Sequence, residues 1–336
     1  MSSPPGAGLA GNTGITMLDI YELHVFLAAA EAGSFSEAGR RLQMSQPAVS
    51  MQIRSLEKRL GVRLFHRAGR HIRLSEIGHA LVPLARDLVN LSIHAEETIA
   101  SLKGEVIGVL KLGCSTTAGK YILPRLIARF IERYPGVQVA CYVVPRGSAL
   151  EMLLDGTAHL SISSLCEPSR TLDYRPLTCD PIVLIAPPDH PWAARAAISV
   201  EELREGRFIV RELNSGTQQA VAQALSQHNL SATALDTVMM LDNSEAIHMA
   251  VAEGIGVAFI SRRAAEEGIQ AGRVVEVRVE GLDIVQQLYM VRHAHRVATG
   301  AQTAFWEFVY APENRALLEY HWVGQGRGQG SPSPVN

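Results

Sequence analysis

From residue 105 to residue 310, the sequence alternates short apolar runs with longer segments of helical periodicity. Such alternation predicts an α/β fold in which helices cover a doubly wound, parallel sheet. The stretch is long enough for two such units. We expect one lobe from residues 105–180 and 284–311, and a second lobe from residues 181–283. Two lobes that are joined by two crossings form a hinged pair, and the cleft between them is a common place for a small ligand.

The individual elements follow from the same alternation. We expect strands over residues 106–112, 137–144, 159–163, 182–186, 208–210, 237–241, 256–260 and 284–291. We expect helices over residues 119–133, 148–154, 216–227, 244–253 and 297–310.

Nearer the N-terminus, residues 45–60 predict a two-faced helix. Ser45 is a good N-cap, and Pro47 falls in the first turn, where its missing N–H costs nothing. The apolar stripe consists of Val49, Ile53, Leu56 and Leu60. The opposite face carries Gln46, Ser50, Gln52, Arg54, Lys58 and Arg59. Polar groups at the start and cations along the body suit a helix that enters a DNA major groove, although an ordinary surface helix shows the same stripe.

The neighbouring segments favour the DNA-reading interpretation. Helices over residues 18–33 and 36–42, with a turn at 43–44, precede the two-faced helix in helix-turn-helix order. Residues 62–65 and 71–74 then predict a β-hairpin wing that carries Arg63, Arg67, Arg70 and Arg73. Residues 36–73 hold nine Lys or Arg against two Asp or Glu, although the whole chain has a net charge of -2. One end of the molecule is therefore expected to meet a polyanion.

A helix over residues 75–103 connects this basic module to the α/β region. A heptad seam runs along it through Leu81, Leu84, Leu88, Leu91, Ala95, Thr98 and Leu102. A helix that lies on its own domain could show the same seam. Because the segment joins a small module to a large one, we expect a linker that forms dimers. The domain limits are then 17–75 for the winged helix-turn-helix, 76–104 for the linker and 105–311 for the two-lobed region.

Composition excludes several classes of protein. No run of about 18 apolar residues exists, so we expect no membrane span. Residues 1–16 lack the basic start and apolar core of a signal peptide, so we expect a flexible extension. Residues 312–336 are expected to be a largely disordered tail. The four cysteines and twelve histidines have no metal-ligand spacing, and no catalytic arrangement is evident, so we expect neither a metal, a cofactor nor enzymatic activity.

Three hydroxyl residues, Ser115, Thr116 and Thr117, stand between a predicted strand and a predicted helix. Free N–H groups at a helix start, together with hydroxyls, form a cradle for an anion. One of the hydroxyls is expected to cap the helix. Three in a row at the carboxyl end of a strand favour binding over capping alone, because α/β folds place ligands there.

A matching segment occurs in the second lobe. Ser215 and Thr217 lie between another predicted strand and helix, and offer a second cradle on the other wall of the cleft. Neither a phosphate P-loop nor a hydrolase elbow fits this segment. Arg146 follows a predicted strand and could fork onto a carboxylate, although a solvated loop arginine is an equally good interpretation.

The sequence resembles the LysR-type transcriptional regulators over nearly all of residues 18–310. The N-terminal resemblance rests on FLAAAEAGSFSEAGRRLQMSQPAVSMQIRSLEKRLGVRLFHR and RLSEIG. The C-terminal resemblance rests on GCSTTAGKYILPRLIARFIERYPGV, RELNSGT and NSEAIHMAVAEGIGVAFIS. The STTAGKYILP segment is similar to members that control carbon fixation or inorganic nutrient assimilation.

The resemblance implies a sequence-specific, cytoplasmic regulator whose effector, a small and anionic molecule, binds between the lobes of a periplasmic-binding-protein-like domain. It also implies a dimer of dimers that binds double-stranded promoter DNA and meets RNA polymerase. The implied DNA contacts are Ser34, Ser45, Gln46, Pro47, Ser50, Arg54, Lys58 and Arg67. The implied effector contacts are Ser115, Thr116, Thr117, Arg146, Ser215 and Thr217. Met51 departs from the family, because members often carry a basic or polar residue there.

Two other classes of protein would share part of this pattern. A solute-binding protein that feeds a transporter would explain the two lobes, but not the basic N-terminal module. A cytosolic α/β enzyme with a helical accessory domain would need a catalytic constellation, and we find none in the sequence.

Overall fold

The computed structural model describes residues 17–68, 71–103 and 105–318. The chain divides into two compact units, residues 1–96 and 97–336. The expected N-terminal extension at 1–16, the centre of the predicted wing turn at 69–70 and the tail beyond 318 lie outside the described residues.

The N-terminal unit is a winged helix-turn-helix. Its elements are α1 (Ile20–Ala32), α2 (Phe35–Leu42), α3 (Gln46–Leu60), β1 (Phe65–Ala68), β2 (His71–Leu74) and the first part of α4 (Glu76–Leu102). The turn between α2 and α3 closes when the Met44 N–H donates to the Gly39 carbonyl at 2.8 Å. A Cβ on Gly39 would lie 2.7 Å from the carbonyl oxygen of Met44, so the tight turn requires glycine. The expected order of helices is confirmed.

The wing begins later than its sequence predicts. β1 and β2 pair in antiparallel fashion from Phe65 opposite Leu74. The preceding residues are held by the end of α3 instead, because the Glu57 carboxylate accepts hydrogen bonds from the N–H groups of Leu64 at 2.8 Å and Phe65 at 3.3 Å. A buried glutamate therefore fixes where the hairpin starts.

Helix α4 buries one side and exposes another. Ala85 and Val89 belong to the core of the N-terminal unit. On the exposed side lie Leu84, Leu88 and Leu91, with 62%, 38% and 52% of their surface accessible. These three leucines belong to the predicted heptad seam.

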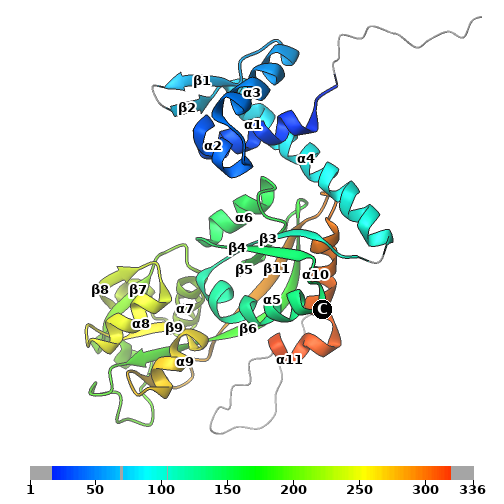
Figure 1. The fold of residues 1–336 in the computed structure, drawn as a ribbon. Coiled ribbons are helices and arrows are strands. Elements are labelled where there is room, and N and C mark those ends of the chain that lie inside the picture. Colours follow the sequence, from blue (N-terminus) through cyan, green and yellow to red (C-terminus); the bar gives the residue numbers. More distant parts are fainter. Residues whose placement is uncertain (1–16, 69–70, 104, 319–336) are drawn as a thin grey trace, which may run out of the picture. The chain divides into compact units, whose positions relative to one another are not determined.

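The C-terminal unit has two lobes with separate cores. Lobe one is built from β3 (Gly108–Cys114), the π-helical turn η1 (Ala118–Ile122), α5 (Leu123–Arg133), β4 (Val137–Val143), α6 (Arg146–Leu154), β5 (Leu160–Ser163) and α10 (Gly300–Tyr310). Lobe two is built from η2 (Glu201–Glu205), β7 (Arg207–Arg211), α7 (Gly216–Gln227), η3 (Ala232–Ala234), β8 (Asp236–Leu241), α8 (Ser244–Ala252), β9 (Ala258–Ser261), α9 (Arg262–Gln270) and β10 (Val275–Val277). Figure 1 shows the two groups at opposite ends of this unit.

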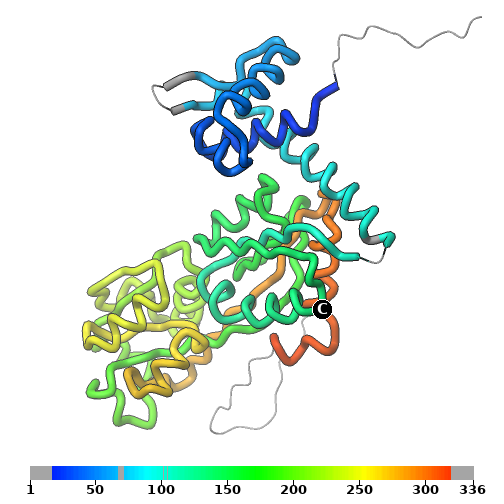
Figure 2. Tube along the Cα trace, in the orientation of Figure 1, coloured from blue at the N-terminus to red at the C-terminus, as the bar shows by residue number. Residues whose placement is uncertain are grey.

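Two long strands, β6 (Leu172–Ala186) and β11 (Ile284–His293), run from one lobe into the other, as the tube in Figure 2 traces. β6 contributes Leu177 to the core of lobe one and Ile182 to the core of lobe two. The sequence predicts only residues 182–186 of this strand, because Pro176 and Pro181 interrupt the pattern and lack an N–H for the ladder. β6 tolerates both prolines while it pairs with β11.

The sheet is only partly parallel, in contrast to the parallel, doubly wound sheet that the alternation predicts. β3 pairs in parallel with β4 and β5, and β7 in parallel with β8. The crossing strands are antiparallel to their neighbours, as are β9 and β10 to β6. A return crossing reverses the direction of the chain, and the alternation of elements alone does not reveal it.

The segment after α10 is ordered, in contrast to the tail expected from residue 312. It forms η4 (Pro312–Asn314) and α11 (Arg315–Leu318), in which Asn314 and Leu318 are buried. The Asn314 side chain donates to the Phe308 carbonyl at 2.7 Å. The prediction of a largely disordered tail covers residues 312–336, most of which lie outside the described residues.

Candidate functional site

Helix α3 presents a polar and cationic face to solvent. The Ser45 hydroxyl caps the helix by accepting from the Ala48 N–H at 3.3 Å. The apolar stripe packs into the core of the N-terminal unit, as predicted. The exposed residues are Gln46, Pro47, Met51, Arg54, Lys58 and Arg59. Residues 47, 51, 54 and 58 recur at helical spacing and form one row along this face.

Ser50, one of the predicted DNA contacts, is largely buried in this structure. Only 8% of Ser50 is exposed, and it lies on the side of α3 that faces the core. Its neighbour Met51 is 63% exposed and stands in the middle of the row.

The cations of the basic module differ in their pairing. Arg40 and Arg41 pair with Glu37, Arg59 with Glu22 and Arg63 with Glu57. Among the described residues, Arg54, Lys58 and Arg73 form no ion pair. The two cations on α3 are thus available to an external anion. Ser34 caps α2 through the Glu37 N–H at 3.5 Å, and Arg67 lies in β1 opposite Ile72.

The first predicted cradle lies at the carboxyl end of β3. Ser115 and Thr116 are partly exposed, and Thr117 is 7% exposed. The expected cap does not form, because Thr117 makes no side-chain hydrogen bond at the helix start. Within the described residues, none of these three hydroxyls has a hydrogen-bond partner. They remain free for a ligand.

The helix after this cradle begins with a π-helical turn. The Leu123 N–H donates to the Ala118 carbonyl, five residues back, in place of the usual four. Pro124 follows and has no N–H to give to the Lys120 carbonyl, which explains the shift of the ladder. Turns of this kind are common at functional sites.

The second cradle lies at the start of α7. Ser215 and Thr217 are each 5% exposed, and Ser215 makes no capping hydrogen bond. A Cβ on Gly216 would overlap the side chains of Ser164 and Gln286, so the helix start approaches the end of β5 and the strand β11 closely. Ser164 and Gln286 therefore lie beside the second predicted cradle, and sequence analysis did not place them there.

The two cradles lie at one edge of the sheet. β3 and β5 are parallel neighbours, with Cys114 opposite Ile162. The next residues along these strands lead to Ser115 on one side and to Ser164 on the other. Since α7 starts against Ser164, the two predicted hydroxyl clusters lie at the ends of neighbouring strands.

Two polar contacts bridge the lobes beside the cradles. Arg146, at the start of α6, donates to the Gln219 side chain on α7 at 2.9 Å. Glu245, on α8, pairs with Lys120 and accepts from the Tyr121 hydroxyl at 3.3 Å. Burial and the Glu245 carboxylate together raise the pKa of Tyr121 to about 12. Burial lowers the pKa of Arg146.

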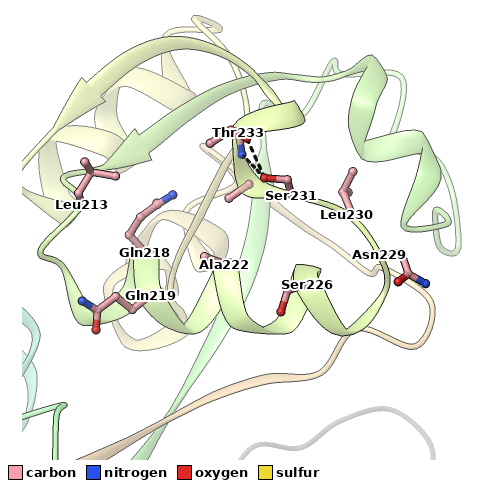
Figure 3. Close-up of a pocket in the computed structure, with 10 residues that line it drawn as sticks. Leu213, Gln218, Gln219, Ala222, Ser226, Asn229, Leu230, Ser231 and Thr233 are labelled. Carbon is pink, nitrogen blue, oxygen red and sulfur yellow. Dashed lines mark hydrogen bonds between the residues drawn. The ribbon is translucent and has the colours of Figure 1, made fainter.

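A separate pocket of about 470 Å³ lies in lobe two between α7 and η3 (Figure 3). Its walls are Leu213, Gln218, Gln219, Ala222, Ser226, Asn229, Leu230, Ser231, Ala232 and Thr233. Ser231 and Thr233 share a hydrogen bond of 2.7 Å across its rim. None of these residues carries a charge, so the pocket offers no counter-charge to an anion.

Two further structural findings bear on the class of protein. The residues that the structure describes contain no group of three side chains that could hold a metal ion. None of the helices in the described ranges is long and apolar enough to cross a membrane.

Comparison with known proteins matches both units to one family. Residues 20–79 match the bacterial regulatory helix-turn-helix protein of the lysR family, and residues 103–311 match the LysR substrate binding domain. The RuBisCO operon transcriptional regulator of Allochromatium vinosum is 33% identical over 298 residues, which are 89% of this chain and 97% of that protein. The chain therefore belongs to the LysR family of transcriptional regulators, which bind DNA and respond to small-molecule effectors.

Solved structures agree with this assignment. A full-length OxyR variant from Pseudomonas aeruginosa superposes with a TM-score of 0.69, at 22% identity, over 88% of this chain and 94% of that one. The CcmR regulatory domain from Synechocystis, solved in complex with 2-PG (2-phosphoglycolate), has a TM-score of 0.54 and 28% identity. That likeness covers 60% of this chain and 95% of the CcmR domain.

Proposed function

We propose that this regulator binds a small anion of the phosphorylated-carboxylate class, such as 2-phosphoglycolate, between the hydroxyl clusters of its two lobes. The ligand would accept hydrogen bonds from Ser115–Thr117 on one side and from Ser215 and Thr217 on the other. The observation that supports the proposal is that the two hydroxyl clusters lie at the ends of neighbouring strands, and no described residue forms a hydrogen bond to their five hydroxyls.

Two observations support this class of ligand: the cations beside the cradles and the similarity to related proteins. Lys120 and Arg146 stand beside the cradles, and each now bonds to a side chain of the opposite lobe. An anion that draws on either cation would change the contacts between the lobes. The 28% identical CcmR domain binds 2-PG, and a 33% identical relative regulates the RuBisCO operon. We therefore expect target genes of carbon assimilation.

The second part of the proposal concerns DNA. Promoter DNA would contact α3 through Gln46, Pro47, Ser50, Arg54 and Lys58, with Ser34, Ser45 and Arg67 near the backbone. The protein would act in the cytoplasm as a dimer of dimers, without catalysis, and would meet RNA polymerase at the promoter. Residues 17–75, 76–104 and 105–311 would serve as the DNA-binding domain, linker and effector domain. Effector binding would shift the lobes and so alter the bend of the DNA, for which a coupling of about 1–3 kcal/mol is enough.

Calorimetric titration with 2-phosphoglycolate tests the effector site. Thr117→Val keeps the shape of the side chain but removes its hydroxyl, so we expect affinity to fall about tenfold or more, the usual loss for a hydrogen bond to a charged group. Thr303→Ala, at an exposed position of α10, is the matched control and should bind as the wild type does. Equal affinity in both variants would contradict the placement of the site.

A further inference from the structure

Two cysteines lie within contact distance at the end of the strand that carries the first cradle. The sulfur atoms of Cys114, on β3, and Cys141, on β4, are 3.5 Å apart. Leu112 is the residue opposite Cys141 in the parallel register, so the two cysteines are offset by two residues along neighbouring strands. Their side chains nevertheless converge on the same face of the sheet.

The two thiols have different environments. Cys114 is fully buried, whereas Cys141 is exposed on β4, the edge strand of the sheet. The hydrogen bond between the two sulfurs, followed by burial, raises the pKa of Cys114. The same bond lowers the pKa of Cys141. The accessible sulfur therefore has more thiolate character, and the thiolate is the nucleophilic form of cysteine.

The buried sulfur is also in contact with the helix start of the cradle. A Cβ on Gly119 would lie only 2.9 Å from Cys114 Sγ, so the sulfur sits directly beneath the π-helical turn. Cys114 is the residue before Ser115, and its carbonyl accepts from the Val144 N–H at 3.0 Å. Any shift of this sulfur is thus passed to the hydroxyl cluster through one peptide unit and one helical turn.

We propose that Cys114 and Cys141 form a reversible oxidation site, at which a hydroperoxide converts the pair to a disulfide that displaces the first cradle. The Cys141 thiolate attacks the terminal oxygen of the hydroperoxide, the O–O bond breaks, and a sulfenic acid forms as water or an alcohol leaves. Cys114 then attacks the sulfenic sulfur with loss of its proton, which forms the S–S bond and releases water. Both sulfurs are oxidised, and the peroxide is reduced.

The geometry indicates why such a bond would act on the cradle. A disulfide needs a sulfur separation of about 2.05 Å, so the two sulfurs must approach each other by about 1.5 Å from their present 3.5 Å. Since the two cysteines are offset along the strands, part of this movement falls on the end of β3. Because Cys141 is exposed, a reductant can reach the bond, which makes the oxidation reversible. The effect on ligand binding, unlike the bond itself, rests on the proposed effector function.

The bond is tested on the full-length protein, reduced and then treated with hydrogen peroxide. Thiol titration should show the loss of two of the four thiols, recovered with dithiothreitol, and peptide mass spectrometry should find Cys114 linked to Cys141 in the same chain. Cys114→Ser should instead leave a sulfenic acid on Cys141 that dimedone traps. Cys141→Ser, at an exposed position, should form no disulfide. The control that lacks the two other cysteines, Cys166→Ser with Cys179→Ser, should still lose two thiols.

Two results would overturn the oxidation site: oxidation confined to Cys166 and Cys179, or a Cys141 disulfide that joins separate chains without Cys114. A second arm measures 2-phosphoglycolate affinity in the reduced and oxidised proteins, for which we expect about a tenfold weakening on oxidation, reversed by dithiothreitol. A disulfide with unchanged affinity would refute its action on the cradle. Disulfide formation in a protein that binds no 2-phosphoglycolate even when reduced would refute the proposed ligand class and leave the oxidation site standing.

Discussion

Arg54 offers a quantitative test of the exposed face of α3. It lies in the row of residues 47, 51, 54 and 58, and neither Arg54 nor Lys58 has an ion-pair partner among the described residues. If Arg54 neutralises one phosphate, Arg54→Ala should reduce the slope of log affinity against log salt by about 0.9 for each protomer on the DNA. Between 50 and 200 mM salt, one such contact accounts for a change of about 3.5-fold, and two in a dimer for about twelvefold.

Fluorescence anisotropy with labelled DNA from upstream of the protein's own gene measures both quantities. The wild type and Arg54→Ala are titrated at several salt concentrations, and the slopes are compared. Arg204→Ala is the control, because Arg204 is an exposed cation of the C-terminal unit. It should leave the slope unchanged.

The possible outcomes separate three interpretations. A weaker affinity with a shallower slope supports a phosphate contact, whereas a weaker affinity with the same slope and reduced sequence preference would assign Arg54 to a base edge. If the affinity and the slope both match the wild type, the exposed row of α3 is not the DNA-binding face, and the reasoning from its unpaired cations is refuted.

Three further predictions concern folding and assembly. Gly39→Val should destabilise the N-terminal unit by about 1–3 kcal/mol or more in urea unfolding, because its Cβ would lie 2.7 Å from the Met44 carbonyl oxygen. Gly147→Ala is the control, because its Cβ meets open space, and it should leave stability unchanged. Similar losses of stability in the two variants would contradict the turn geometry. Burial raises the pKa of Asp180 to about 6, above its unfolded value of about 3.8. The contribution of its protonated carboxyl to the free energy of unfolding is therefore fully present below pH 3.8 and is lost as the pH rises through 6. Between pH 4 and pH 7, the free energy of unfolding of the C-terminal unit should therefore fall by about 2 kcal/mol more in the wild type than in Asp180→Asn, and parallel pH profiles would exclude this. Leu88→Glu should lower the molecular mass found by analytical ultracentrifugation, because it charges the exposed leucine row of α4, and an unchanged mass would place the oligomer contacts elsewhere.

Sequence patterns located the N-terminal unit well because each signal was local. Ser34 and Ser45 are the caps of α2 and α3, and Gly33, with φ of 59°, ends α1. Caps and left-handed glycines depend on a few adjacent residues, so a single sequence reveals them. The start of the wing was mispredicted because it depends on Glu57, whose hydrogen bonds to Leu64 and Phe65 are tertiary contacts.

The C-terminal unit was less predictable wherever distant segments meet. The antiparallel crossing strands and the ordered segment at 312–318 depend on contacts across the whole unit, such as the pairing of Ile284 with Ile182. α9 and β10 were also missed. Their short segments lack the periodicity that reveals longer elements.

In the candidate site, too, local features could be predicted from the sequence and contacts between distant residues could not. The two hydroxyl clusters stand out in the sequence because they follow strands. Ser164 and Gln286 could not be found in this way, because only the close approach of Gly216 brings them to the site. The 3.5 Å approach of Cys114 and Cys141 is likewise invisible in the sequence, where 26 residues separate the two cysteines.

The central claim is that a small anion bound between the lobes alters how this LysR family member binds promoter DNA. Anisotropy titration with the upstream DNA, with and without 2-phosphoglycolate and in the presence of excess nonspecific DNA, tests this claim directly. We predict sequence-preferring binding at sub-micromolar protein, with an affinity or footprint that the ligand shifts by about 5- to 150-fold. Titration curves that coincide with and without the ligand would contradict the effector mechanism, and equal affinity for unrelated DNA would contradict specific promoter binding.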